Sequence, residues 1–359
     1  MSQDGPVRPL DGRVVRQDHA TRTVRAMTES QDDSGVDLYQ VAVDLAAYDD
    51  PPPALYVYRQ TLGDATYTGV VCDVAVRAIA EGQVRGHEAV ERLRVEALIW
   101  HHSRTHGPPA LVKLLHVAGP AYSRCLAEAQ QAEPLLDFDG PNGLRQTVWR
   151  LPDGPEARAV AEEMGRATLY IADGHHRAAA ALETWRSEGE PAEAGLWCLI
   201  YPLDALSLSA FHRRASGPLE PGRLVALLGE HFDLTKAEAP PTPALGRVGV
   251  YLDGQWYDAR LTSERPAGVA GLDVTLLQRL VLDRLDPAPP GRVRTVETHP
   301  EATPLAELLA RCDNDHGALF TLAAPSAATV IEVADAGEVM PPKATYFQPK
   351  PAAGIFLRR

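Results

Sequence analysis

The sequence predicts a mixed α/β protein made of two units, on three observations. Strand and helix patterns alternate through much of the chain, which is typical of a sheet covered by helices. Pairs of strand-like segments separated by short turns add hairpins to that sheet. At 359 residues the chain is too long for one minimal core. We therefore place a first unit in residues 1–217 and a second α+β unit in residues 218–359.

The first unit is predicted to begin with a hairpin. Residues 54–60 and 67–76 are rich in aromatic and β-branched side chains, a composition that favours strands. The apolar spacing over 89–102 predicts an amphipathic helix. Further strands are predicted at 111–117, 147–151, 166–171 and 195–203, and further helices at 121–132, 156–164 and 178–185.

The second unit is predicted to combine helices with another hairpin. Asp253 and Gly254 separate two strand-like segments, and Asp-Gly is a strong signal for a hairpin turn. Thr303 and Pro304 suit the N-cap and the first position of a helix. The elements predicted in this unit are strands at 248–252, 255–261, 317–322 and 355–358, and helices at 223–231, 272–285 and 304–312.

Composition limits the class of function. The formal charge is −13, from 35 basic and 48 acidic residues, which disfavours nucleic acid or an anionic membrane as a partner. No run of about 18 apolar residues occurs, and the N-terminus lacks a signal-peptide core. The four cysteines are dispersed without a C-x-x-C pair. We expect a cytoplasmic protein with reduced cysteines, and the sequence leaves its oligomeric state open.

The candidate site centres on the run YIADGHHRAAAA. It reads as a strand and a helix joined by a turn at Asp173 and Gly174. A helix N-terminus offers unpaired N–H groups and partial positive charge, so His175, His176 and Arg177 would complete a cradle for phosphate. In a plainer interpretation, Asp173 is an N-cap and the basic side chains are solvated. Three basic residues oppose the helix dipole unless an anion binds, which favours the site.

A second unusual stretch is ADAGEVMPPKATYFQPK at 334–350, which has no helix or strand period. A long ordered loop of this kind could lay Lys343, Thr345 and Tyr346 over the site. The alternative is a packed C-terminal tail with solvated lysines. The segment FHRR adds a second basic cluster, which includes His212.

These motifs resemble one known family. The chain resembles the bacterial domain-of-unknown-function family 1015 through PALYVYRQT, GHE, YIADGHHRAAAA, FHRR and ADAGEVMPPKATYFQPK, which extend over nearly the whole chain. It departs from that family at 22–37, where the usual Pro-Pro-Tyr-Asp segment has no equivalent. The DGHHR motif is also similar to the nucleotide-binding motif of the ParB/sulfiredoxin superfamily, and most of all to that of its free-serine kinases. This resemblance implies a ParB/sulfiredoxin-like nucleotide-binding core, with 334–350 returning toward the site.

The cradle and the resemblance together predict phosphoryl transfer to a small hydroxylated metabolite. That reaction needs charge neutralisation, a divalent metal and a carboxylate near the hydroxyl. Similarity to the serine kinases implies Glu88 as the base and L-serine, giving O-phosphoserine, as the first substrate. We expect ATP or ADP and Mg²⁺ as cofactors. Asp173 is expected to bind the metal or to act in catalysis, and His175 to be a further catalytic residue. The phosphate-binding residues expected are Gly174, His175, His176, Arg177, Lys343 and Thr345, and the substrate-binding residues expected are His87, His212, Arg213 and Tyr346.

Two other classes of function stay open. A ParB-like regulatory protein would bind or hydrolyse a nucleotide without small-molecule kinase activity, although the acidic charge and the lack of an evident helix-turn-helix extension disfavour it. A sulfiredoxin-like reductase needs a cysteine near the phosphate, and no cysteine lies between Cys125 and Cys198. The nucleotide itself is not fixed, because neither a Walker A motif nor a G-x-G-x-x-G motif is present.

Overall fold

The computed structural model describes residues 5–29, 43–102, 110–287 and 293–359, so part of the segment 22–37 lies outside the described residues. The chain divides into two compact units, Met1–Ser207 with Pro349–Arg359, and Leu208–Gln348. The boundary therefore precedes Leu208 instead of following residue 217, and the last residues of the chain belong to the first unit. No helix in the described part is long and apolar enough to cross a membrane.

Strand pairing explains where the units divide. The strand β13 (Phe211–Ala215), which carries FHRR, pairs with β17 (Val296–Pro300) and β18 (Ala318–Thr321) of the second unit. At the C-terminus, β20 (Phe356–Leu357) pairs with β2 (Arg13–Val15) of the first unit. Both pairings join segments far apart in sequence, and local patterns do not encode such partners.

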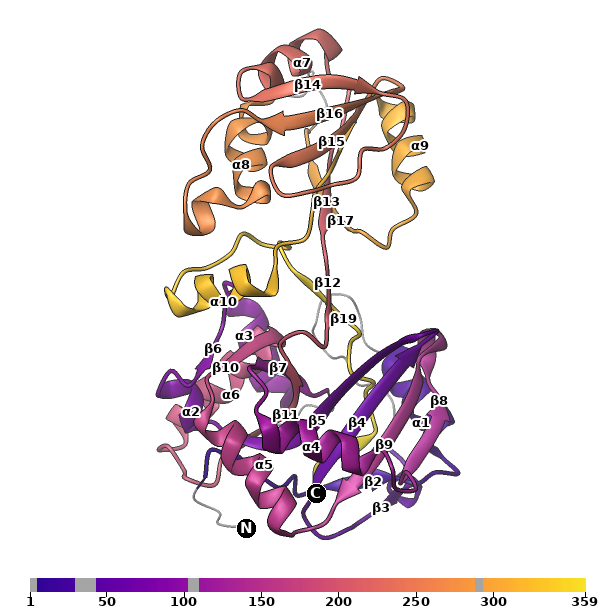
Figure 1. Ribbon diagram of the computed structural model, residues 1–359, viewed down its shortest axis with the longest axis vertical. Helices are drawn as coiled ribbons and strands as arrows, with labels where there is room; N and C mark the ends of the chain where they lie inside the picture. Colours follow the sequence, from indigo (N-terminus) through magenta and orange to yellow (C-terminus); the bar gives the residue numbers. More distant parts are fainter. Residues whose placement is uncertain (1–4, 30–42, 103–109, 288–292) are drawn as a thin grey trace. The chain divides into compact units, whose positions relative to one another are not determined.

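The first unit is built on one large mixed sheet (Figure 1). Its strand order is β6-β10-β7-β11-β5-β4-β9-β8, with β1 also paired to β5. β10 runs parallel to β6 and β11 parallel to β7, whereas the other described pairs are antiparallel. A smaller sheet has the order β20-β2-β3. The strands are β1 (Val7–Arg8), β3 (Tyr48–Asp49), β4 (Leu55–Leu62), β5 (Ala65–Ala75), β6 (Val84–Arg85), β7 (Val112–His116), β8 (Leu136–Asp139), β9 (Arg145–Leu151), β10 (Leu169–Asp173) and β11 (Gly195–Pro202).

Most helices of this unit cover one face of the large sheet, whereas the C-terminal segment, with the helix at residues 20–29 packed against it, lies on the other. Alternate strand positions such as Val70 pack with Tyr122 and Met164 of two helices in one apolar core. The intervening positions point the opposite way, where the hydroxyl of Tyr58 accepts the N–H of Ala352 at 3.2 Å. The helices are α1 (Ala20–Glu29), α2 (Arg77–Ala80), α3 (Arg92–His102), α4 (Pro120–Ala129), α5 (Pro155–Arg166) and α6 (His175–Ser187), with 3₁₀ turns at Leu45–Ala47 and Pro141–Gly143.

The second unit has an antiparallel sheet of order β14-β16-β15-β18-β13-β17. Phe320, Leu277 and Val250 lie in its apolar core. The predicted hairpin is confirmed, with Asp253 and Gly254 at φ of 48° and 76° in its turn. Its other elements are β12 (Ser207–Ser209), α7 (Pro221–Gly229), β14 (Phe232–Ala237), β15 (Arg247–Leu252), β16 (Gln255–Leu261), α8 (Asp273–Leu280), α9 (Leu305–Asp315), α10 (Ala327–Asp335) and β19 (Tyr346–Gln348), with 3₁₀ turns at Gly268–Gly271 and Leu282–Arg284.

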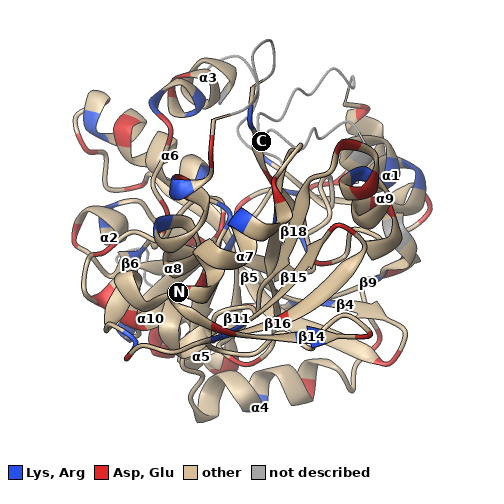
Figure 2. Cartoon of the chain, turned by 90° about the horizontal axis from the view of Figure 1, so that it is seen from above, with Lys and Arg blue, Asp and Glu red and all other residues tan. Residues whose placement is uncertain are grey.

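The predicted mixed α/β class is confirmed, with local differences in element ends. The helix predicted over 272–285 ends as α8 at Leu280, because Val281 has φ −128° and ψ −61° and breaks the helical backbone. The helix predicted over 178–185 begins earlier, at His175. Acidic and basic positions are interspersed along α3 and α9 (Figure 2). Neither helix therefore presents the basic stripe that is typical of nucleic-acid binding.

Candidate functional site

The predicted strand, turn and helix lie where β10 passes into α6. β10 ends at Asp173, Gly174 precedes the helix with φ 104° and ψ 26°, and α6 begins at His175. A Cβ atom at Gly174 would lie 3.0 Å from Cγ2 of Val112 and 3.1 Å from Nη2 of Arg177. Both the positive φ and the crowding require glycine here. Among the residues that the structure describes, no side chain caps the start of α6, so its first N–H groups are available to an anion.

Glu88 and His175 form the first functional pair. Nδ1 of His175 lies 3.3 Å from Oε2 of Glu88, and Nε2 accepts the backbone N–H of His87 at 3.2 Å. Because Nε2 accepts, the ring proton is on Nδ1 and faces the carboxylate. Burial raises the pKa of Glu88, but the hydrogen bond from His175 and the electrostatic influence of the two neighbouring histidines outweigh it and leave that pKa below its usual value. Glu88 is therefore an ionised carboxylate of fixed orientation, with 31% of its side chain exposed.

His87 lies behind this pair instead of on an accessible surface. It is fully buried, and its ring meets that of His175 edge-on with centroids 4.6 Å apart. Burial, with the nearby His175, lowers the pKa of His87 to about 3. The structure thus gives His87 a position from which it orients His175, and not the substrate contact that we predicted.

A cluster of charges surrounds Asp173. Nη2 of Arg177 donates to Oδ2 of Asp173 at 2.6 Å, and Lys113 is the cross-strand partner of Asp173. Burial raises the pKa of Asp173, but the positive charges of Lys113, Arg177 and Lys350 outweigh it and lower that pKa to about 2. Three cations around one carboxylate leave an excess of positive charge beside the start of α6. Such a site favours a bound anion.

Lys113 and Lys350 are site residues that sequence reasoning missed. Lys113 is fully buried on β7, and its ammonium donates to the carbonyl of Pro349 at 3.1 Å. Burial lowers its pKa to about 8, against the opposing effect of Asp173. Lys350 follows directly in the chain and is exposed. The available signal was a lysine inside the apolar run LVKLLHV, since lysine is rarely buried in a strand without a partner.

His176 and Arg177 are engaged elsewhere than we predicted. Nε2 of His176 accepts the N–H of Glu91 at 3.0 Å, which ties α6 to the segment before α3. Nη1 of Arg177 donates to the carbonyl of Leu111 at 2.9 Å, and Nη2 is taken by Asp173. These two side chains therefore join α6 to the neighbouring segments of the first unit. The excess positive charge beside the start of α6 comes from the buried Lys113, the exposed Lys350 and the α6 N-terminus.

The predicted Mg²⁺ role of Asp173 does not fit this geometry. Its Oδ2 is paired with Arg177, and cations surround the carboxylate, so a divalent cation would meet repulsion there. Among the described residues no group of three or more His, Cys, Asp or Glu could hold a metal ion.

The remaining predicted residues meet one another in the second unit. Nη2 of Arg213 donates to the carbonyls of Pro342 and Lys343, and Nδ1 of His212 accepts the N–H of Leu322 at 3.4 Å. The ring of Tyr346 packs against Phe211, and Thr345 is buried. The structure thus joins the FHRR strand to the 334–350 segment. Contact of Lys343, Thr345 and Tyr346 with the first-unit site stays a prediction.

Comparison with known proteins gave a family and several distant structures. A family model described as "Protein of unknown function (DUF1015)" matches residues 44–286. No curated protein matches. The chain is similar to SbnI with a C-terminal truncation from Staphylococcus aureus, at 13% identity and a TM-score of 0.43, over 80% of this chain and 85% of that one.

Two further solved structures are similar at the same distance. A free serine kinase in complex with AMP has 14% identity and a TM-score of 0.37, over 79% of this chain and 92% of that one. A conserved hypothetical protein from Pyrococcus furiosus has 13% identity and a TM-score of 0.37, over 80% of this chain and 95% of that one. These likenesses are too distant to assign roles to individual residues.

Proposed function

Because the chain belongs to the DUF1015 family, whose description names no activity, we propose a function from the chemistry of its first unit. The protein is a nucleotide-dependent phosphotransferase that acts on a small hydroxylated metabolite, with free L-serine, giving O-phosphoserine, as the first candidate. One observation carries the proposal: an ionised, partly exposed Glu88 held by His175 lies at the same helix start as a cluster of excess positive charge.

The positive cluster supplies what a transferred phosphoryl group needs. Phosphoryl transfer depends mainly on positioning and on neutralising the charge of the phosphate oxygens. Lys113 and Lys350 would neutralise that charge, and the first N–H groups of α6 would donate to the phosphate oxygens. The Asp173 carboxylate holds Arg177 through an ion pair and attracts the ammonium of Lys113. ATP or ADP as donor, and Mg²⁺, stay predictions.

In this proposal Glu88 acts as the general base. The substrate hydroxyl oxygen attacks the terminal phosphorus of the nucleotide, and the bond from that phosphorus to the bridging oxygen breaks. The hydroxyl proton passes to the Glu88 carboxylate, and the nucleotide leaves with one phosphate fewer. The Nδ1–H of His175 fixes the orientation of that carboxylate, and the buried His87 N–H fixes the ring of His175 in turn.

The decisive experiment incubates the full-length protein with Mg²⁺, ATP or ADP and a pool of amino acids and other hydroxylated metabolites. Mass spectrometry then identifies any product heavier by one phosphate, and calorimetry measures nucleotide binding separately. A phosphorylated metabolite that disappears with Glu88→Gln supports the proposal, with Glu128→Gln on the exposed face of α4 as matched control. Nucleotide binding without any product would favour the ParB-like regulator. No nucleotide binding would exclude both.

A further inference from the structure

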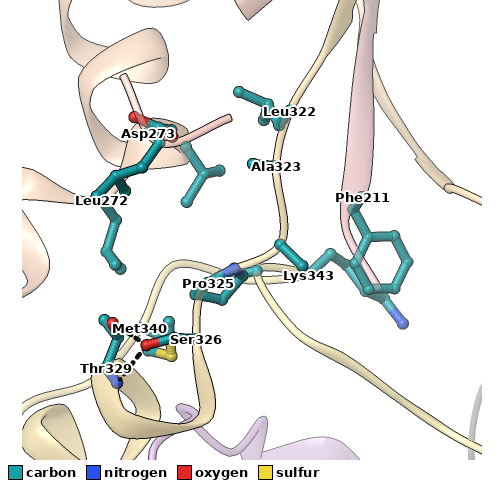
Figure 3. Close-up of a pocket in the computed structure, with 14 residues that line it drawn as sticks. Phe211, Leu272, Asp273, Leu322, Ala323, Pro325, Ser326, Thr329, Met340 and Lys343 are labelled. Carbon is teal, nitrogen blue, oxygen red and sulfur yellow. Dashed lines mark hydrogen bonds between the residues drawn. The ribbon is translucent and has the colours of Figure 1, made fainter. Parts of the chain in front are cut away.

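The second unit contains a cavity of about 170 Å³ that the proposed phosphotransferase site does not use (Figure 3). The two stretches singled out in the sequence meet at its wall, because β13 contributes Phe211 and the 334–350 segment contributes Met340, Lys343 and Ala344. Leu272 and Leu322 complete an apolar lining. A concave, mostly apolar space with a few polar groups is the usual form of a small-molecule site.

The polar groups in this wall are already bonded to one another. The carboxylate of Asp273 accepts the N–H of Gly246 at 3.1 Å and pairs with Arg265 at 2.5 Å. The hydroxyl of Ser326 accepts the N–H of Thr329 at 3.0 Å. These groups present little unsatisfied polarity to the cavity. The part of a ligand that enters it is therefore apolar.

One cation, Lys343, lines the cavity, and a second, Arg213, donates to the backbone carbonyl of Lys343 at 2.9 Å. Arg213 is 3% exposed and donates to the main-chain carbonyls of Phe211, Pro342 and Lys343. The ammonium of Lys343 lies over the Phe211 ring, 5.7 Å from its centroid. Within the described residues the contacts of Arg213 are with backbone carbonyls and that of Lys343 is with an aromatic ring, so neither cation is paired with a carboxylate. A buried cation that lacks a counter-ion favours an anion nearby.

The backbone fixes the base of the Lys343 side chain at this edge. Lys343 has φ 54°, which is uncommon for a residue with a Cβ, and the hydrogen bond from Arg213 to its carbonyl, at 2.9 Å, holds that conformation. Figure 3 shows the side chain running from the cavity wall past Phe211. The side chain is exposed, so its ammonium is free to leave the ring face for a carboxylate.

We propose that this cavity binds a small monocarboxylate with a compact apolar or aromatic tail. The tail occupies the space between Leu272, Met340 and Pro325, and the carboxylate pairs with the ammonium of Lys343 beside Phe211. The volume suits one six-membered ring with a short chain, since engineered apolar cavities of about 150 Å³ bind benzene. The proposal is independent of the phosphotransferase activity, which concerns the first unit.

The test titrates the full-length protein with phenylacetate and with its neutral counterpart phenylacetamide, by calorimetry and ligand-observed NMR. We expect millimolar binding of phenylacetate, about tenfold tighter than that of phenylacetamide. Lys343→Met should remove the difference, whereas Lys236→Met, an exposed lysine away from the cavity, should keep it. Ala323→Leu should fill the cavity and weaken both ligands about tenfold or more, with the exposed Ala328→Leu on α10 as control.

Urea unfolding checks that each variant folds. If Ala323→Leu does not fold, Leu245→Ser replaces it, because Leu245 is 75% exposed at the cavity and its loss should still weaken both ligands severalfold. Absence of saturable phenylacetate binding would overturn the proposal. Equal affinity for the two ligands, or binding unchanged by both cavity variants, would overturn it as well.

Discussion

Lys113 and Asp173 are partners across the neighbouring strands β7 and β10, and each shifts the ionisation of the other. Burial lowers the pKa of Lys113 to about 8, with the charge of Asp173 opposing that shift. The charge of Lys113 is in turn the largest of the influences that lower the pKa of Asp173 to about 2. The cation and the anion are therefore both present at neutral pH, and only the lysine loses its charge as the pH rises.

Nucleotide affinity should therefore fall above pH 8. Lys113 is protonated below its pKa and neutral above it, so its attraction for phosphate is present at low pH and lost as the pH rises. Replacing Lys113 by Met should weaken nucleotide binding at pH 7 by about 1.5 to 3 kcal/mol, the range for a charge-assisted contact. Calorimetry from pH 6.5 to 9.5 measures both effects, with Lys236→Met as control. A Lys113→Met protein with wild-type affinity would contradict the phosphate role of this lysine.

Turnover should depend on Glu88 more than nucleotide affinity does. A base that receives the hydroxyl proton acts in the transition state, so Glu88→Gln should lower turnover by about 10² to 10⁴ and leave nucleotide binding nearly intact. Steady-state kinetics with the metabolite identified as the substrate measure turnover, and calorimetry measures nucleotide affinity. Wild-type turnover in Glu88→Gln would contradict this role, and Asp173→Asn would then test whether Asp173 is the base.

Arg177→Ala should destabilise the first unit. Its guanidinium is bonded to Asp173 and to the carbonyl of Leu111, so its removal leaves a partly buried carboxylate and a buried carbonyl without these partners. We expect a loss of about 2 to 4 kcal/mol in the free energy of unfolding. Arg166→Ala is the matched control, because its pair with Glu162 on α5 is exposed and should contribute under about 0.5 kcal/mol. Equal urea midpoints for both variants would refute this prediction.

Gly174→Ala should weaken the fold more than the same change at Gly189. Both glycines have positive φ, 104° and 84°, but a Cβ at Gly174 meets Val112 at 3.0 Å, whereas one at Gly189 meets nothing within 4 Å. Gly189→Ala isolates the backbone term of about 1 kcal/mol. Gly174→Ala adds the steric contact, and we expect at least about 1 kcal/mol more. Urea unfolding measures the free energy of unfolding of both variants. Equal losses would show that the contact with Val112 adds no strain.

Stability should fall as the pH drops from 6.5 toward 4. Burial lowers the pKa of His116 to about 4 and that of His87 to about 3, below the value of an unfolded chain. The unfolded state therefore binds protons first, so these groups contribute stability above pH 6.5 that is lost on acidification. Near pH 5 the loss is about 2 kcal/mol for each histidine.

His116→Phe separates the two contributions. Within the described residues neither ring nitrogen of His116 has a hydrogen-bond partner, and its ring packs edge-on against Tyr122. Phenylalanine keeps that ring contact and cannot be protonated, so the variant should lose less stability between pH 7 and 5 than the wild type. His19→Phe, at a more exposed position, is the matched control. An identical pH dependence in His116→Phe would show that this ring is not the group being titrated.

Local sequence patterns predicted most of the elements and the position of the candidate site. Apolar periodicity and turn residues are local signals, so they identified the β10–α6 turn at Gly174, the Asp253 hairpin and the mixed α/β class. Family motifs predicted Glu88 and the DGHHR run as parts of one site. In the structure, Oε2 of Glu88 lies 3.3 Å from Nδ1 of His175.

Long-range contacts in the fold set which groups surround the candidate site. Lys113 and Lys350 reach Asp173 through the pairing of β7 with β10 and through the return of the C-terminal segment over the sheet. Arg177 donates to the carbonyl of Leu111, just before β7, and His176 accepts the N–H of Glu91, just before α3. Charge partners of this kind depend on contacts between residues far apart in the chain. A local pattern fixes which face a side chain takes, but not what lies opposite it.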